Sequence, residues 1–211
     1  PGRRLEVLQN WLGAPADAPS SIVVSETALA GRKVFVYAGN MGVAQGMGIL
    51  LDLAERLRGR TDVGFLFVGR GSDAQRLRDD ARARGLDNVV FRDEIHPDEI
   101  PNLYAQCHIG LVALDPRHRT HNIPGKFLTY MQSGLPVLAS VNAGNDLVGL
   151  IEQERVGRAV TDASAESLAR AAVELVDAVS SDDGFAERCK ALSARLFSAE
   201  TAVRQIVSAL A

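Results

Sequence analysis

The sequence predicts an α/β fold in which a Rossmann-like parallel sheet is flanked by helices and followed by extra C-terminal helices. Short apolar runs, such as 34–38 and 63–68, have the pattern of strands that are buried on both faces. A glycine turn and a helical segment follow each of these two runs, and the alternation continues to about residue 160. Strands that alternate with helices at this pitch form right-handed βαβ units, and therefore a parallel sheet.

Glycines and capping residues mark the first half of this alternation. The strand 34–38 ends at a glycine turn, and an amphipathic helix is expected at 46–58. The strand 63–68 is followed by a helix that reaches Arg84, with Ser72 as its N-cap and Gly85 as its stop. The next strand and helix are expected at 88–91 and 98–106.

The second half repeats the same order and ends in helices. Strands are expected at 109–113, 136–140 and 157–160. The helix that precedes the strand at 136 ends at Gly134, which is typical of a helix C-terminus. The remaining helices are expected at 124–133, 146–154, 164–179, about 185–196 and about 199–210.

Composition limits the classes of function. With 211 residues and 46% hydrophobic residues, the chain can bury the core of one full-sized α/β domain. The net charge of -3 and the lack of a basic block argue against nucleic-acid binding. No apolar run approaches the roughly 18 residues of a membrane span, so we expect a cytoplasmic protein.

The cysteines and histidines do not indicate a metal or redox site. Cys107 and Cys189 lie far apart and outside any CxxC spacing, so we expect small buried thiols, with a disulfide as the alternative. The four histidines show no metal-ligand spacing, and we expect no metal.

Two glycine turns lie where a parallel sheet binds ligands, beyond the carboxyl ends of its strands. In 39–42, two glycines let the backbone approach a ligand and place several N–H groups at its mouth; a tight turn without a ligand is the alternative. In 69–72, Arg70 stands between two glycines, where it either pairs with a phosphate or lies along the surface.

The segment 122–127 is the strongest local indication of an anion site. Pro124 suits the first position of a helix, and Gly125 leaves no side chain over the helix mouth. Lys126 then stands in the first turn, where a cation opposes the helix dipole unless an anion is bound. The segment therefore favours a phosphate site over a solvated surface lysine.

Two further loops follow strands. The polar loop 115–121 either contacts a sugar or diphosphate through its basic residues or is a mobile surface loop. In 142–146, Asp146 either recognises hydroxyl groups or caps the next helix, and we expect the cap.

Together these segments resemble the C-terminal domain of family-4 glycosyltransferases, which have the two-domain GT-B fold. The resemblance covers about residues 33–160, and 124–140 is its most specific part. It is closest to the branch that builds bacterial surface polysaccharides, including transferases of N-acetylated deoxyhexosamines. The segments that carry it are 37–46, 67–71, 88–91, 100–105 and 124–140.

The resemblance implies a nucleotide-sugar-binding domain at 31–182, entered by an interdomain connector at 1–30. Helices at 183–211 would pack back toward an N-terminal, acceptor-binding domain. Since residue 1 is Pro and not Met, we expect a part of a longer enzyme that is inactive alone. The family transfers sugars with retention and without a metal, usually from UDP-sugars. The implied transfer is of a hexose or an N-acetylated (deoxy)hexosamine, in the synthesis of a lipopolysaccharide, capsule or exopolysaccharide. A lipid-linked acceptor would bring the enzyme to the membrane surface.

The resemblance also implies site residues, with two departures from the usual pattern. Many members carry Glu-x7-Glu where this sequence has His121 and Thr129, and Arg and Lys where it has Asn40 and Gln45. Backbone N–H groups of 39–42 and Lys126 would then hold the diphosphate. The implied catalytic residues are His121 and Lys126, and the implied nucleotide-sugar-binding residues are Gly39, Asn40, Gly42, Gln45, Gly69, Arg70, Ile95, Pro124, Gly125, Lys126 and Thr129.

Three other functions fit parts of the sequence. A nucleotide-sugar 2-epimerase shares the fold but needs catalytic carboxylates and a histidine between its domains. A non-catalytic nucleotide-sugar-binding scaffold is favoured by the missing Glu pair. An NAD-binding domain is disfavoured, because the first turn is not GxGxxG and no acidic residue ends the second strand.

Overall fold

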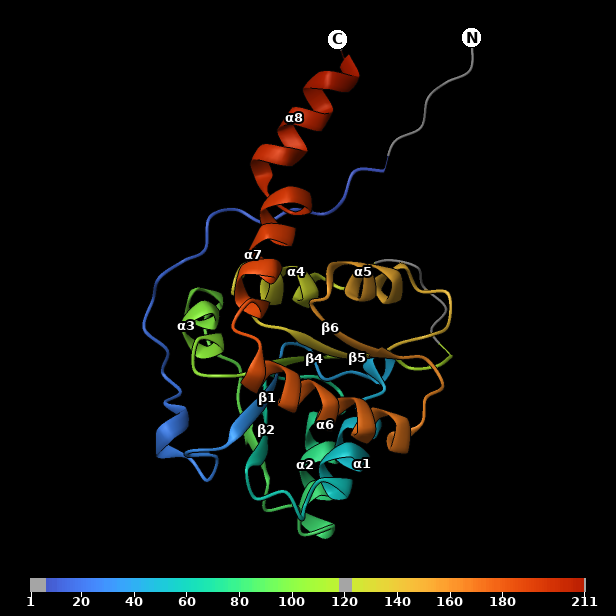
Figure 1. Cartoon of the computed structure of the whole chain (residues 1–211). Coiled ribbons are helices and arrows are strands. Elements are labelled where there is room, and N and C mark those ends of the chain that lie inside the picture. Colours follow the sequence, from blue (N-terminus) through green and yellow to red (C-terminus); the bar gives the residue numbers. More distant parts are fainter. Residues whose placement is uncertain (1–6, 118–122, 211) are drawn as a thin grey trace.

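The computed structural model describes residues 7–117 and 123–210, and it confirms the fold class (Figure 1). One six-stranded parallel sheet runs in the order β3-β2-β1-β4-β5-β6. This order reverses between β1 and β4, which is the Rossmann arrangement. The strands are β1 Lys33–Ala38, β2 Val63–Val68, β3 Val89–Arg92, β4 Ile109–Ala113, β5 Val137–Ser140 and β6 Gly157–Val160.

The central strands β2, β1, β4 and β5 are almost entirely apolar because helices cover both faces of the sheet. In β1 and β2, Phe35 is the register partner of Phe65, and their rings stack with centroids 5.1 Å apart. Such aromatic pairs help to fix the register of neighbouring strands. The helices are α1 Gly48–Arg56, α2 Ala74–Ala83, α3 Ile100–Tyr104, α4 Gly125–Gln132, α5 Asp146–Glu154, α6 Ala165–Ser181, α7 Phe185–Leu196 and α8 Ala199–Leu210.

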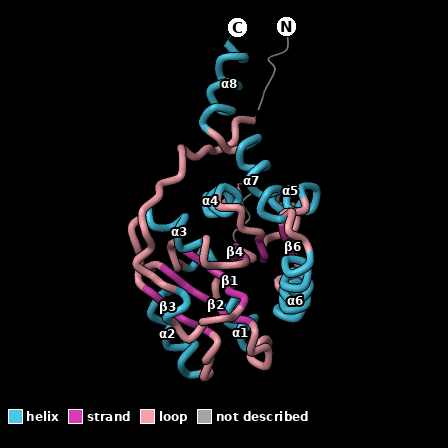
Figure 2. The backbone as a smooth tube through the Cα atoms, turned by 60° about the vertical axis from the view of Figure 1, so that its left-hand side comes forward, coloured by secondary structure: helices cyan, strands magenta, loops and turns pink. Residues whose placement is uncertain are grey.

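Two hydrophobic cores lie on opposite faces of the sheet. Figure 2 shows the strands with helices packed on both sides of them. One core joins the sheet to α1, α2 and α6, and the other joins it to α3, α4, α5 and α7. Alternate residues of β1 divide between them, so that Phe35 and Tyr37 face the first core and Val34 and Val36 the second. This alternation matters for the site, because Tyr37 and α4 belong to different layers.

Several expected helix ends differ from those observed. Ser72 is not the N-cap of α2, since Asp73 holds that position without a side-chain cap bond. Asp146 is not the cap of α5, because the side chain of Asn145 accepts from Leu147 N at 2.9 Å and Asp146 is the first helical residue. Pro124 is the N-cap of α4 and not its first residue, with extended backbone at ψ 138°.

Other helix boundaries shift by one or two residues or change in type. A 3-10 turn at Val43–Gln45 precedes α1, and another at Pro97–Glu99 precedes the short α3. The predicted stops at Gly85 and Gly134 are confirmed, because both glycines have the left-handed backbone of a helix C-terminus.

The segments before β1 and after α6 are tied to the domain. Ile22, Val24 and Leu29 are buried in the core on the α4 side. Leu12 N donates to Phe197 O at 2.8 Å, which joins the N-terminal segment to the end of α7. Helix α8 extends away from the sheet (Figure 1) and exposes Val203, Val207 and Leu210. The domain limits at residues 30 and 182 stay predictions.

The cysteines are free thiols, Cys189 buried and Cys107 half-buried, and burial raises the pKa of both to about 12. Within the part of the chain that is described, no helix is long and apolar enough to span a membrane.

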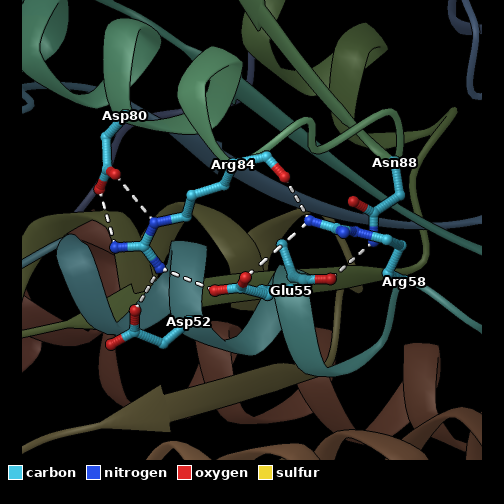
Figure 3. A network of polar contacts seen from close by, with 7 residues as sticks. Asp52, Glu55, Arg58, Asp80, Arg84 and Asn88 are labelled. Carbon is cyan, nitrogen blue, oxygen red and sulfur yellow. Dashed lines mark hydrogen bonds and ion pairs between the residues drawn. The ribbon is translucent and has the colours of Figure 1, made fainter.

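Arg84 joins α1 to α2 through a network of carboxylates (Figure 3). Its guanidinium contacts Asp80 on its own helix at 2.8 Å, and Asp52 and Glu55 on α1 at 2.6 and 3.2 Å. Arg58, in the turn that follows α1, donates in return to the carbonyl oxygen of Arg84. A network shared by several charges contributes more than an isolated surface pair.

We predict that Arg84→Ala lowers the free energy of unfolding by about 1 kcal/mol, because one truncation breaks three ion pairs that are only partly screened. Urea denaturation at low and high salt measures this loss, which should shrink in 1 M NaCl.

The matched control is Arg82→Ala, since Arg82 is 77% exposed and pairs within its helix with Asp79. Its effect should stay within about 0.5 kcal/mol. Equal losses from the two variants would contradict a special role for Arg84.

Candidate functional site

A cavity of about 620 Å³ opens at the carboxyl ends of β1 and β2. Its wall is completed by the segment after β3 and by α3 and α4. Seven of the eleven predicted binding residues line it, namely Gly39, Asn40, Gly69, Arg70, Ile95, Lys126 and Thr129. The topology therefore brings together residues that lie up to 90 positions apart in the sequence.

The two glycine turns at this edge pack directly on each other. Gly39 N donates to Val68 O at 2.9 Å, and Met41 N donates to Arg70 O at 2.7 Å. Gly69 has φ 139°, and a Cβ atom there would overlap with the carbonyl oxygen of Gly39. Glycine is therefore required at 69 for contact between the turns, whatever the cavity binds.

The expectation that 39–42 presents several free N–H groups to a ligand is wrong. The N–H groups of Gly39 and Met41 are used between the turns, and Gly42 N donates to Gln45 Oε1 at 3.0 Å. The amide of Asn40 also donates to Gln45 Oε1, at 3.3 Å. Gln45 thus closes the turn from within, and neither it nor Gly42 lines the cavity.

Lys126 reaches into the cavity from the first turn of α4. Its Nζ donates to Tyr37 Oη at 2.8 Å and lies 4.0 Å from the centroid of the Tyr37 ring. Burial lowers the pKa of Lys126 from its ordinary 10.5 to about 8. A cation that is partly removed from water interacts more strongly with an incoming anion than a surface lysine does.

The rest of the α4 N-terminus lies at the rim. Gly125 is exposed, and a Cβ atom there would meet no atom within 4 Å, so the helix mouth is uncrowded. Thr129 is one turn further along, lines the cavity and donates to Gly125 O at 3.5 Å. Pro124 and Gly125 do not themselves line the cavity.

Arg70 and Ile95 line the cavity from the segments that follow β2 and β3. Arg70 is 82% exposed, and its Nε forms an ion pair of 2.7 Å with Glu94 Oε2. Ile95 is partly buried against the core on the α4 side. Arg70 is therefore an exposed cation that is already paired with a carboxylate. The ammonium of Lys126, in contrast, is hydrogen-bonded to a tyrosine hydroxyl in the cavity wall.

Sequence analysis missed four lining residues in the segment 94–104: Glu94, Pro97, Ile100 and Tyr104. This segment follows β3, so it is a strand-to-helix connection at the ligand-binding edge of the sheet. It lacks a glycine turn, so no local pattern marks these side chains as ligand contacts. Tyr37 was also missed, because inside an apolar strand it has the pattern of a core residue.

The loop after β4 meets the loop after β1. Asp115 N donates to Ala44 O at 3.0 Å, and the Asp115 carboxylate pairs with Arg117 at 2.7 Å. His121 lies outside the described residues. Within residues 7–117 and 123–210, no three His, Cys, Asp and Glu side chains are grouped so that they could hold a metal ion.

We predict that Gly69→Ala lowers the free energy of unfolding by about 2 kcal/mol or more. The methyl group would overlap with Gly39 O, and the backbone at 69 has a positive φ that alanine rarely adopts. Chemical denaturation measures the loss.

Gly59→Ala is the control, since nothing lies within 4 Å of a Cβ atom there and its backbone is not left-handed. It should be neutral. A neutral Gly69→Ala would show that the two turns do not need this close approach.

Curated relatives match parts of the chain. WcaI of Escherichia coli (strain K12), a glycosyl transferase named for colanic acid biosynthesis, is 35% identical over 121 residues, which are 57% of this chain and 30% of the relative. The O-antigen chain mannosyltransferase C of Escherichia coli is 34% identical over 77 residues, 36% of this chain and 20% of the relative. The chain thus spans about a third or less of the length of these two proteins.

Solved structures share the fold at low identity. The HepE protein of Anabaena in complex with UDP-glucose superposes with a TM-score of 0.73 at 20% identity, over 89% of this chain and half of HepE. WaaG, a glycosyltransferase involved in lipopolysaccharide biosynthesis, gives 0.67 at 15% identity, over 83% of this chain and 46% of WaaG.

The family match covers the whole sheet, helices α1 to α5 and most of α6. Residues 32–178 match the family described as glycosyl transferases group 1, and the chain belongs to that family.

Proposed function

We propose that this chain forms the donor site of a retaining, metal-independent glycosyltransferase and binds the diphosphate of a UDP-sugar in the cavity beside Lys126. The observation that carries the proposal is the ammonium of Lys126, held inside a cavity at the carboxyl edge of the sheet. An anion bound there would gain a charge-assisted hydrogen bond in a partly desolvated place.

The surroundings of Lys126 favour an anion over a neutral ligand. The ammonium has no carboxylate ion-pair partner among the described residues, whereas Arg70 is already paired with Glu94. The N-terminus of α4 adds the positive end of a helix dipole to the same region. Since Gly39, Met41 and Gly42 use their N–H groups within the protein, Lys126 and the N-terminus of α4 supply the positive potential in this proposal.

The choice of UDP-sugar and of pathway rests on the relatives. HepE binds UDP-glucose, and WcaI and the O-antigen mannosyltransferase act in the synthesis of surface polysaccharides by their names. We therefore propose transfer of a hexose or an N-acetylated (deoxy)hexosamine to a growing surface polysaccharide. The acceptor site would belong to a further part of a longer protein.

The proposed chemistry is electrostatic. As the bond between the sugar carbon and the diphosphate oxygen breaks, negative charge grows on the diphosphate. A fixed ammonium and a helix N-terminus stabilise that charge without having to reorient. His121 is proposed as the second catalytic group on the resemblance alone, as it stands where many relatives have a glutamate.

We predict that Lys126→Met weakens UDP binding by roughly tenfold or more at pH 7, because it removes a charge-assisted hydrogen bond but keeps the aliphatic stem. Isothermal titration calorimetry on the 211-residue chain measures this. Lys190→Met is the matched control, since Lys190 is exposed and outside the cavity. Equal affinities for all three proteins would remove Lys126 from the site and the proposal with it.

UDP affinity should also depend on pH in a defined direction. Lys126 is charged below its pKa of about 8 and loses its proton as the pH rises through that value. Affinity should therefore fall between pH 7 and 9, a range above the titration of the terminal phosphate, whose pKa is about 6. Calorimetry at four pH values tests this, and Lys126→Met should give a flatter profile. The same fall in both proteins would assign the titration to another group.

A further inference from the structure

Tyr37 connects the two layers of the fold at the edge where the cavity opens. It belongs to the core on the α1 side of the sheet, whereas α4 packs on the other side. Lys126 nevertheless reaches from α4 to the Tyr37 ring and hydroxyl. Their contact therefore crosses the carboxyl edge of the sheet, between residues 89 positions apart in sequence.

The hydroxyl of Tyr37 uses both of its hydrogen-bonding functions. It accepts from Lys126 Nζ at 2.8 Å and donates to Asn40 O at 2.6 Å. A chain of hydrogen bonds therefore runs from the ammonium through the tyrosine to the backbone of the glycine turn. The ring face adds a cation–π contact at 4.0 Å.

The ammonium of Lys126 also lies next to the glycine turn. A Cβ atom at Gly39 would lie 3.9 Å from Cε and 4.0 Å from Nζ of Lys126. The ammonium is thus in contact with both Gly39 of the turn and the Tyr37 ring. Because these contacts already restrict its side chain, Lys126 loses less rotamer freedom on meeting a ligand than an unrestrained lysine would.

The groups around Lys126 cannot replace Tyr37. Tyr104 of α3 and Tyr130 of α4 are buried, and burial raises the pKa of each, so both stay neutral. Tyr130 Oη contacts the carbonyl oxygens of Val36 and Leu111. Glu94 and Arg70 are paired with each other at the rim.

We propose that Tyr37 is a positioning residue, which holds the Lys126 ammonium beneath the glycine turn in the orientation that meets the diphosphate. This inference rests on the proposed function for its ligand. Tyr37 does not act as a base, because burial raises its pKa and its proton is donated to Asn40 O. Its effect is carried entirely through Lys126.

Tyr37→Phe is the test variant, because it keeps the ring and removes only the hydroxyl. UDP affinity at pH 7 should fall by about tenfold, the loss of one hydrogen bond to a charged group. In a Lys126→Met background the same substitution should have little effect, since the two act on one interaction. Tyr130→Phe is the matched control, as it removes a buried tyrosine hydroxyl that contacts two backbone carbonyl oxygens and Tyr104 but not Lys126.

A second measurement needs no ligand. The chain has three lysines, Lys33, Lys126 and Lys190, so side-chain NMR can follow each ammonium through a pH titration. Loss of the accepting oxygen disfavours the charged form, so the Lys126 midpoint should be lower in Tyr37→Phe than in the wild type. Tyr130→Phe should leave it in place, and thermal melting confirms that each variant is folded.

The outcomes separate the two proposals. Equal weakening by Tyr37→Phe with and without Lys126 would overturn the inference, because Tyr37 would then act through the turn at Asn40. An unchanged Lys126 midpoint together with unchanged affinity would also overturn it. If the wild-type chain does not bind UDP, the proposed function fails, and the NMR midpoint still decides whether Tyr37 holds the ammonium.

Discussion

Burial of the sheet on both faces is the constraint on which the rest of the structure depends. Helices α1, α2 and α6 cover one face and α3, α4, α5 and α7 the other, so the central strands β2, β1, β4 and β5 carry almost only apolar side chains. The polar side chains of the candidate site lie at the carboxyl edge of the sheet. At the carboxyl edge the strand order reverses between β1 and β4, and loops from several strands converge there.

At that edge the two glycine turns pack against each other and share backbone hydrogen bonds. Gly39 and Gly69 lie in contact, and Met41 N–H is bonded to Arg70 O. This packing fixes the shape of the cavity wall. It also occupies backbone N–H groups that could otherwise donate hydrogen bonds to a phosphate. In the proposed function, the positive potential for a phosphate comes instead from Lys126 at the start of α4.

The placement of Lys126 has a cost that its neighbours reduce. Burial lowers its pKa to about 8, which shows that the charged form is disfavoured there. The Tyr37 hydroxyl and ring offset part of this penalty while leaving the ammonium beside the cavity. An ammonium held in this way is less stable alone than with an anion, and this difference is available for binding.

The sequence by itself determined the fold class, the positions of the strands and most of the cavity residues. Burial of a parallel strand is visible in its own five or six residues, and glycines such as Gly85 and Gly134 mark helix ends locally. Only the tertiary structure decided what each site residue contacts. Asn145 and not Asp146 caps α5. The N–H groups of Gly39 and Met41 bond to the carbonyl oxygens of residues 68 and 70, and that of Gly42 bonds to Gln45. Tyr37 is a hydrogen-bond partner of Lys126. The Asn145 cap and the Gln45 contact are local choices between neighbouring polar side chains. The contacts between the two glycine turns and between Tyr37 and Lys126 depend on strand order and on the fit of distant segments, which no local pattern of residues encodes.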